Sequence, residues 1–136
     1  IKKFYENADV FCTPTRGEGF GMTIAQSAIS GVSCIVPSMG GHLDYLDREN
    51  NYFINCQLEP ASNMLSEFYS AKDMNLVECS LSSTRKMLRL AYNDWKSNKL
   101  YDKSQKVKLY AKKFLDEQSI FNKFIGNDTI VKKKCY

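Results

Sequence analysis

The sequence has 136 residues, of which 43% are hydrophobic and 25% are charged, and a formal net charge of +4. These values fit one globular domain with a hydrophobic core, and they exclude a chain that is disordered throughout. No apolar run approaches the length of a transmembrane helix, and no secretory signal is visible.

The positive charge is uneven, because lysine is dense after Lys99. A basic segment could contact nucleic acid or an anionic membrane, but such charge runs usually form a solvated helix face. We therefore expect no nucleic-acid partner and keep peripheral membrane contact as an option.

The five cysteines predict neither a disulfide framework nor a zinc site, since their number is odd and no Cys-x-x-Cys pair occurs. Cys12 and Cys34 lie inside apolar runs, which predicts that both are buried. Free thiols without a secretory signal favour a reducing, cytoplasmic location.

Residues 1–60 show the alternation of apolar runs and helical patterns that is typical of a parallel α/β sheet. A strand, a helix and a second strand in succession imply two neighbouring parallel strands joined by a crossover. The predicted elements are a helix-like start at 1–7, strands at 9–14, 32–37 and 52–54, a helix at 21–30 ended by Gly31, and a helical turn at 43–46.

From Ala61 onward the patterns predict mainly helices, although 61–80 gives no clear pattern. Serines at 80–83 offer N-caps for a helix at 84–96. A last helix is predicted at 103–124, and 127–136 is expected to be a loose tail outside a domain of residues 1–126. The side chains expected to face inward are Met87, Leu90, Ala91 and Trp95 on the first helix, and Val107, Tyr110, Ala111, Phe114 and Leu115 on the second.

Two glycine-bearing loops, 15–20 and 38–42, each follow a predicted strand. Ligands bind at the carboxyl ends of the strands in open α/β sheets. The first loop leads into a helix, whose start offers unpaired N–H groups and a partial positive charge. Gly19 and Gly21 would let an anion approach that backbone closely. These features predict a phosphate site, with a simple tight turn as the alternative.

The segment from Pro14 to Met22, with Ala28 and Gly31, resembles the signature of glycosyltransferase family four. That family has a Glu-Gly-Phe-Gly turn and a second glutamate after seven intervening residues. Gly40 and Gly41 with Asp44 resemble its next loop, so the resemblance covers 8–54 well. It implies an α/β fold: a Rossmann-like parallel sheet with flanking helices, which is the C-terminal half of a GT-B fold, followed by a helical C-terminal tail.

The resemblance also implies the roles of the site residues. Glu18 would be the catalytic residue that faces the donor sugar, and backbone N–H groups after it would hold sugar hydroxyls and the pyrophosphate. Position 26 would bind the ribose. The donor-binding set would be Arg16, Gly19, Phe20, Gly21, Met22, Thr23 and Gln26, with Gly40, Gly41 and His42 in the second loop.

Structural alternatives exist for several of these residues. Glu18 could be a carboxylate that stabilises the helix start, and Thr23 with Gln26 fits a capping box. Arg16 could be an exposed turn residue, and a lone loop histidine such as His42 is more often structural than catalytic. Gln26 also departs from the family pattern, which has glutamate there.

The implied activity is transfer of a sugar, with retention, from a UDP- or GDP-linked donor to an acceptor hydroxyl, without a metal or another cofactor. The alternatives are a non-catalytic nucleotide or carbohydrate binder and a phosphorylase-like GT-B protein. A dinucleotide oxidoreductase is disfavoured, because its fingerprint needs a glycine spacing that residues 17–21 do not have.

The chain starts at Ile1 without a methionine, and the family's acceptor-binding N-terminal domain and its upstream Arg/Lys pair do not appear in it. We therefore expect the fragment alone to be inactive. With little chain left to bury Phe114, Phe121 and Phe124, we also expect an exposed apolar patch and formation of a homo-oligomer.

Overall fold

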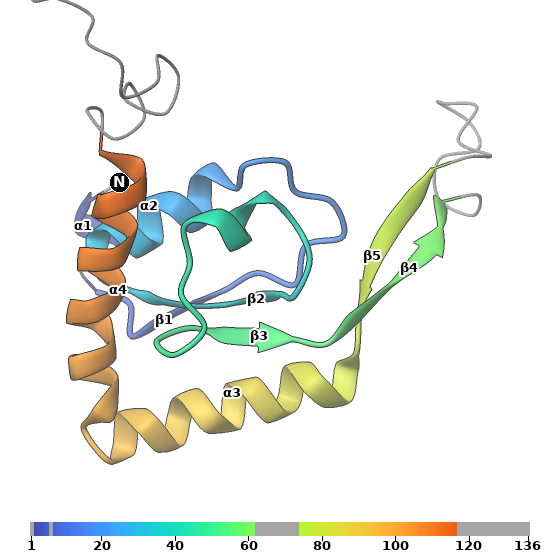
Figure 1. The fold of residues 1–136 in the computed structure, drawn as a ribbon. Helices are drawn as coiled ribbons and strands as arrows, with labels where there is room; N and C mark the ends of the chain where they lie inside the picture. The colour runs from blue at the N-terminus through green and yellow to red at the C-terminus, as the bar shows by residue number, and fades with distance from the viewer. Residues whose placement is uncertain (1, 6, 62–73, 117–136) are drawn as a thin grey trace, which may run out of the picture.

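The protein, seen here as a computed structural model, is described for residues 2–5, 7–61 and 74–116. Its centre is a parallel three-stranded sheet in the order β1 (Val10–Cys12), β2 (Ser33–Pro37) and β3 (Tyr52–Ile54) (Figure 1). The predicted α/β class and parallel sheet are confirmed. The first strand is shorter than the 9–14 predicted for it.

Helix α2 (Met22–Ser30) connects β1 to β2, as the strand–helix–strand pattern predicts. Gly21 precedes it and Gly31 follows it, and both have left-handed backbones, with φ of 78° and 86°. A side chain is strained in that conformation, so glycine defines both helix ends. The chain begins with the short helix α1 (Lys2–Tyr5).

The core lies on both faces of β2, whose five residues are all buried. Strand side chains alternate between faces, so Cys34 and Val36 pack with α2, while Ile35 packs on the other side. Two buried clusters result, and helices cover both. Such complete burial explains why the strand reads as one apolar run.

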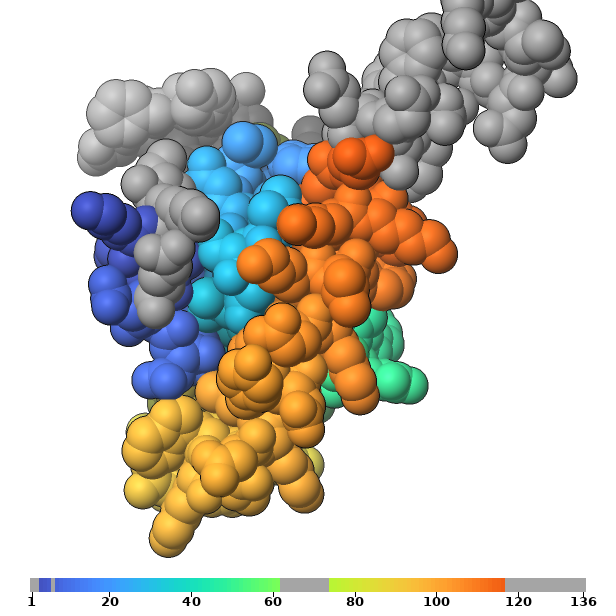
Figure 2. Space-filling view, turned by 90° about the vertical axis from the view of Figure 1, so that its left-hand side faces the viewer, coloured from blue at the N-terminus to red at the C-terminus, as the bar shows by residue number. Residues whose placement is uncertain are grey.

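Helices α3 (Leu81–Lys96) and α4 (Lys99–Leu115) complete the fold; α3 runs beneath the sheet and α4 stands at its end (Figure 1). Figure 2 shows α4 beside α2 on the same side of the molecule. Asp94 of α3 links this helix to β3 and to α4. It accepts a hydrogen bond from Tyr52 of β3 at 2.8 Å, and it pairs with Lys103 of α4 at 2.9 Å. None of the described helices is long and apolar enough to cross a membrane.

The segment that precedes α3 contains two strands that the sequence pattern did not predict. Residues there form an antiparallel hairpin of β4 (Cys56–Pro60) and β5 (Asn75–Cys79), whereas helices were expected after Ala61. Strand β5 has only five residues, and its partner lies far away in the sequence, so the local pattern did not reveal it.

The helix boundaries and faces also differ in part. Helix α3 starts at Leu81, three residues early, because Ser80 is its N-cap. Of the residues expected to face inward on α3, Ala91 is buried and Met87 packs against the core, whereas Leu90 is 41% and Trp95 51% exposed, which corrects half of the expected stripe.

On α4, Val107 and Ala111 are buried as expected and Tyr110 is exposed. Helix α4 begins at Lys99, four residues before the predicted start. The helix ends at Leu115, where the prediction had one helix continuing to residue 124. The backbone of Asp116 is extended, so the predicted helix is interrupted there. Residues 117–124 and the predicted tail at 127–136 lie outside the described residues.

Candidate functional site at the two glycine loops

The two glycine loops meet beyond the carboxyl ends of β1 and β2 (Figure 1). A Cβ atom placed on Gly41 would lie 2.0 Å from the carbonyl oxygen of Gly19. The backbone at Gly40 has φ of 130°, which a side chain rarely adopts. Glycine at these positions therefore allows the loops to pack backbone against backbone, and their residues form one surface.

The first loop presents an open helix start. Within the described part of the chain, the N–H groups of Met22, Thr23 and Ile24 donate to no protein acceptor. Phe20, Met22 and Thr23 are exposed, and Gly19 has nothing within 4 Å of its Cβ position. The start of α2 therefore has the free donors that an anion needs.

Glu18 lies against this helix start and is half-buried. Its Cγ would be 3.3 Å from a Cβ atom at Gly21, so the side chain folds over the glycine. The side chain of Glu18 thus lies beside the glycine that precedes α2.

Tyr45 anchors the first loop through its buried side chain, and the sequence analysis did not predict this role. Its one O–H proton is shared between the carbonyl oxygens of Phe20, at 2.7 Å, and Gly21, at 2.9 Å. The residue is 1% exposed, and burial, with the nearby charges of Cys34 and Glu18, raises the pKa of its hydroxyl. The only sequence signal was a tyrosine in the predicted 43–46 turn, which the structure forms as the 3-10 helix η1 (Gly41–Asp44).

Arg16 lies at the border between the first loop and the hairpin. Its guanidinium pairs with Glu78 of β5 at 3.0 Å, and its carbonyl accepts from the N–H of Val77 at 2.7 Å. The structure thus places Arg16 in contact with β5, and it anchors the hairpin to the first loop.

His42 is fully buried beneath the second loop. Its Nε2 is 2.8 Å from the carbonyl oxygen of Pro37, and because a carbonyl only accepts, this nitrogen carries the proton. Nδ1 is buried and has no hydrogen-bond partner among the described residues. A Cβ at Gly40 would lie 2.9 Å from Nδ1, so this glycine leaves room for the ring.

Thr23 and Gln26 lie inside α2, after its N-cap at Gly21. The capping-box alternative is wrong, because Thr23 is the second residue of the helix and no side chain caps it. Gln26 is half-buried and lies one turn after Met22, on the same face of the helix.

The comparison with protein families agrees with this geometry. Residues 1–67 match the family model for glycosyl transferases group 1, a range that holds both glycine loops, α2 and Tyr45. Residues 1–67, just under half of the chain, are therefore similar to this glycosyltransferase family. The comparisons with curated proteins and with solved structures found no match.

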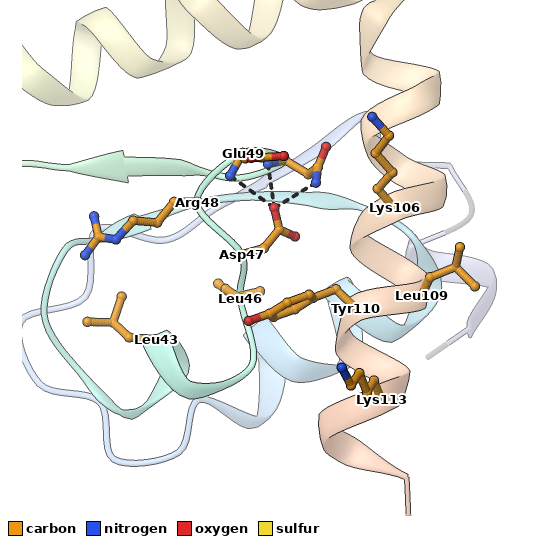
Figure 3. Close-up of a pocket in the computed structure, with 10 residues that line it drawn as sticks. Leu43, Leu46, Asp47, Arg48, Glu49, Lys106, Leu109, Tyr110 and Lys113 are labelled. Carbon is orange, nitrogen blue, oxygen red and sulfur yellow. Dashed lines mark hydrogen bonds between the residues drawn. The ribbon is translucent and has the colours of Figure 1, made fainter.

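One hollow of the described residues lies away from the glycine loops. A hollow of about 790 Å³ lies between the loop after η1 and α4 (Figure 3). There Asp47 Oδ1 accepts from the N–H of Glu49 and from both nitrogens of Asn50, at 2.7 to 3.1 Å, which shapes the loop. None of the predicted donor-site residues lines this hollow, so the volume of a hollow alone does not identify the glycine loops as the site.

The cysteines are free in the described residues. Cys34 is buried as predicted, whereas Cys12 is exposed, which corrects the expectation for that residue. Cys12 ends the edge strand β1, where fewer neighbours cover the chain. Cys135 lies outside the described residues.

Proposed function

We propose that this chain supplies the donor site of a retaining glycosyltransferase, which transfers a sugar from a nucleotide-diphospho-sugar to an acceptor hydroxyl. One observation carries the proposal: the family match spans both glycine loops, and these loops meet around an open helix start. The proposed donor is UDP- or GDP-linked, the proposed location is cytoplasmic, and no metal takes part in the proposed transfer.

The order of groups along the loop suits such a donor. Glu18 would hydrogen-bond the sugar, the N–H groups of Gly21 and Met22 would hold the diphosphate, and Gln26 would contact the ribose. Gln26 is four residues beyond Met22, or about 6 Å along the helix axis. Sugar, diphosphate and ribose follow each other in the same order along the donor.

The electrostatics of the site suit its part in the reaction. Negative charge develops on the leaving diphosphate when the bond to the sugar breaks. Fixed N–H donors at a helix start stabilise that charge without reorganisation. The carboxylate of Glu18 would lie on the sugar side of the donor and orient its hydroxyls.

Calorimetric titration with UDP-glucose, GDP-mannose and the free diphosphates UDP and GDP tests the proposal. Glu18→Ala should weaken binding of the intact donor, while binding of the free nucleoside diphosphate stays nearly the same. Glu49→Ala, which removes an exposed carboxylate of another loop, is the matched control. Equal loss for donor and free diphosphate would count against the sugar contact.

A non-catalytic nucleotide-sugar binder is the second candidate, and Gln26 is the observation that favours it, since the resembled family has glutamate there. A binder would hold the donor without releasing nucleoside diphosphate from it. Chromatography of donor incubated with the chain and a panel of acceptors separates the two candidates.

A further inference from the structure

We propose that Tyr45 is a positioning residue of the donor site, whose buried hydroxyl orients two peptide groups of the first glycine loop so that their N–H groups face the diphosphate. This inference rests on the proposed function and names a residue that neither the family signature nor the sequence pattern assigned.

The geometry begins with the two carbonyls that the hydroxyl reaches. The carbonyl of Phe20 shares a peptide group with the N–H of Gly21, and the carbonyl of Gly21 shares one with the N–H of Met22. Both carbonyl oxygens lie within 2.9 Å of the Tyr45 hydroxyl. In a trans peptide the C=O and N–H bonds point in opposite directions, and the described chain has no cis peptide. The N–H groups of Gly21 and Met22 therefore point away from Tyr45.

The two peptide groups depend on Tyr45 to different degrees. The Gly21 carbonyl also accepts from the N–H of Ala25 at 2.8 Å, which is the first turn of α2. Among the described residues, the Phe20 carbonyl accepts a hydrogen bond from Tyr45 alone. Loss of the hydroxyl should thus release the Phe20–Gly21 peptide first, and with it the N–H of Gly21.

Neighbouring residues are fitted to this arrangement. A Cβ atom at Gly21 would lie 2.8 Å from the Tyr45 hydroxyl oxygen, so only glycine leaves the hydroxyl its position. The rings of Phe20 and Tyr45 lie 5.2 Å apart, which holds the loop over the tyrosine. Because Tyr45 directly follows η1, the second glycine loop sets the backbone of the first.

The test is Tyr45→Phe, which removes one oxygen atom and keeps the ring. Binding of UDP, GDP and inorganic pyrophosphate is compared with binding of uridine and guanosine by calorimetry. A neutral hydrogen bond contributes enough to change affinity by about 3- to 10-fold. We expect that loss for pyrophosphate and for the nucleoside diphosphate that the wild type binds, with nucleoside binding unchanged.

Tyr52→Phe is the matched control. Tyr52 is also buried, and its hydroxyl donates at 2.8 Å to the carboxylate of Asp94 on α3, away from both glycine loops. Both variants should lose similar thermal stability, but only Tyr45→Phe should lose affinity for the diphosphate. Unchanged pyrophosphate affinity in Tyr45→Phe, or equal loss for nucleosides, would overturn the inference.

Two further outcomes keep the inference separate from the proposed function. If the wild type binds neither diphosphate nor pyrophosphate, the proposed function fails and the inference falls with it. If Tyr45→Phe does not fold, NMR of the wild type tests the inference instead. The amide proton signals of Gly21 and Met22 should shift downfield when pyrophosphate is added. Unchanged signals would overturn the role of Tyr45.

Discussion

At the scale of single residues, Gln26 decides how strongly the proposed site holds a ribose. A carboxylate can accept from both ribose hydroxyls, whereas glutamine has one acceptor oxygen and an NH₂ group that needs an acceptor. Charge-assisted hydrogen bonds contribute about 1.5–3 kcal/mol and neutral ones about 0.5–1.5 kcal/mol. The difference is on the order of 1 kcal/mol, or roughly five-fold in affinity.

We therefore predict that Gln26→Glu tightens nucleoside diphosphate binding by about five-fold, and that Gln26→Leu weakens it. A deoxyribose analogue, which lacks one hydroxyl, should lose the gain. Calorimetric titration of the three proteins measures this. Equal affinity of Gln26→Glu and wild type for both nucleotides would mean that the ribose lies elsewhere.

Cys34 makes a second prediction at this scale, on pH. Its thiol is buried beside Ser27, and burial raises its pKa to about 12, although the Ser27 hydrogen bond opposes the rise. The pKa of this thiol is near 9 in the unfolded chain, so in the folded state the thiol stays protonated to a higher pH. The stabilisation is complete below about pH 9 and is lost as the pH rises toward 12.

We expect the free energy of unfolding to fall steadily above pH 9, and to fall less steeply in Cys34→Ala. Urea unfolding at pH 8, 9 and 10.5 measures both slopes. Buried Tyr45 and Tyr52, whose pKa values burial also raises, should leave part of the slope in the variant. Identical slopes would show that Cys34 does not carry the effect.

At the scale of elements, the sequence predicted those helices and strands whose signals lie within the segment itself. The bounds of β3 were predicted correctly, and α2 was placed to within one residue, because apolar periods and flanking glycines lie inside each segment. The signal for β5 was too short, and its register with β4 depends on residues far apart. The face of α3 was misjudged at Trp95, since only packing against the sheet decides which apolar residue is buried.

In the candidate site, too, the sequence predicted residues that lie in a local motif and missed those that depend on contacts between distant segments. Glu18 and the glycines of the first loop lie in one continuous motif, and Gly40 and Gly41 lie in a second one, so local patterns predicted them. Tyr45 was not predicted, because its hydrogen bonds cross 24 and 25 positions of the sequence. The ion pair between Arg16 and Glu78 also depends on a hairpin that the sequence did not reveal.

The contact between the loops gives an element-scale prediction with an internal control. Gly41→Ala places a methyl group within 2.0 Å of the Gly19 carbonyl oxygen, so the loops must separate. Gly19→Ala adds the same group where nothing lies within 4 Å. Thermal melts should show Gly41→Ala destabilised by about 1–3 kcal/mol, as is typical of overpacking, and Gly19→Ala nearly unchanged. Equal melting temperatures would contradict the packing of the two loops.

At the scale of the whole molecule, apolar side chains gather beside the edge of the sheet. A hollow of about 310 Å³ lies between β1 and α3, lined by Val10, Ala91 and the exposed residues Leu88, Tyr92 and Trp95. In the described residues β1 pairs only with β2, so its outer edge is open. The patch expected around Phe114 is not supported, since that ring packs against the core, and Phe121 and Phe124 lie outside the described residues.

We predict that the chain self-associates through this face, because such exposed apolar patches favour contact. Sedimentation equilibrium over a range of concentrations should show a mass above that of one chain. Trp95→Lys should lower the association constant, and Leu109→Lys, at an exposed position of α4, should not. A monomer at all concentrations would contradict this.

The central claim is that the two glycine loops bind a nucleotide-diphospho-sugar, and the position of the bound donor tests it most directly. In an ¹⁵N NMR titration with UDP-glucose and GDP-mannose, we predict that one of them shifts the amide signals of residues 18–23 and 40–42. Signals around the larger hollow, at Asp47, Asn50 and Lys113, should stay in place. Shifts confined to that hollow, or no shift with either donor, would contradict the claim.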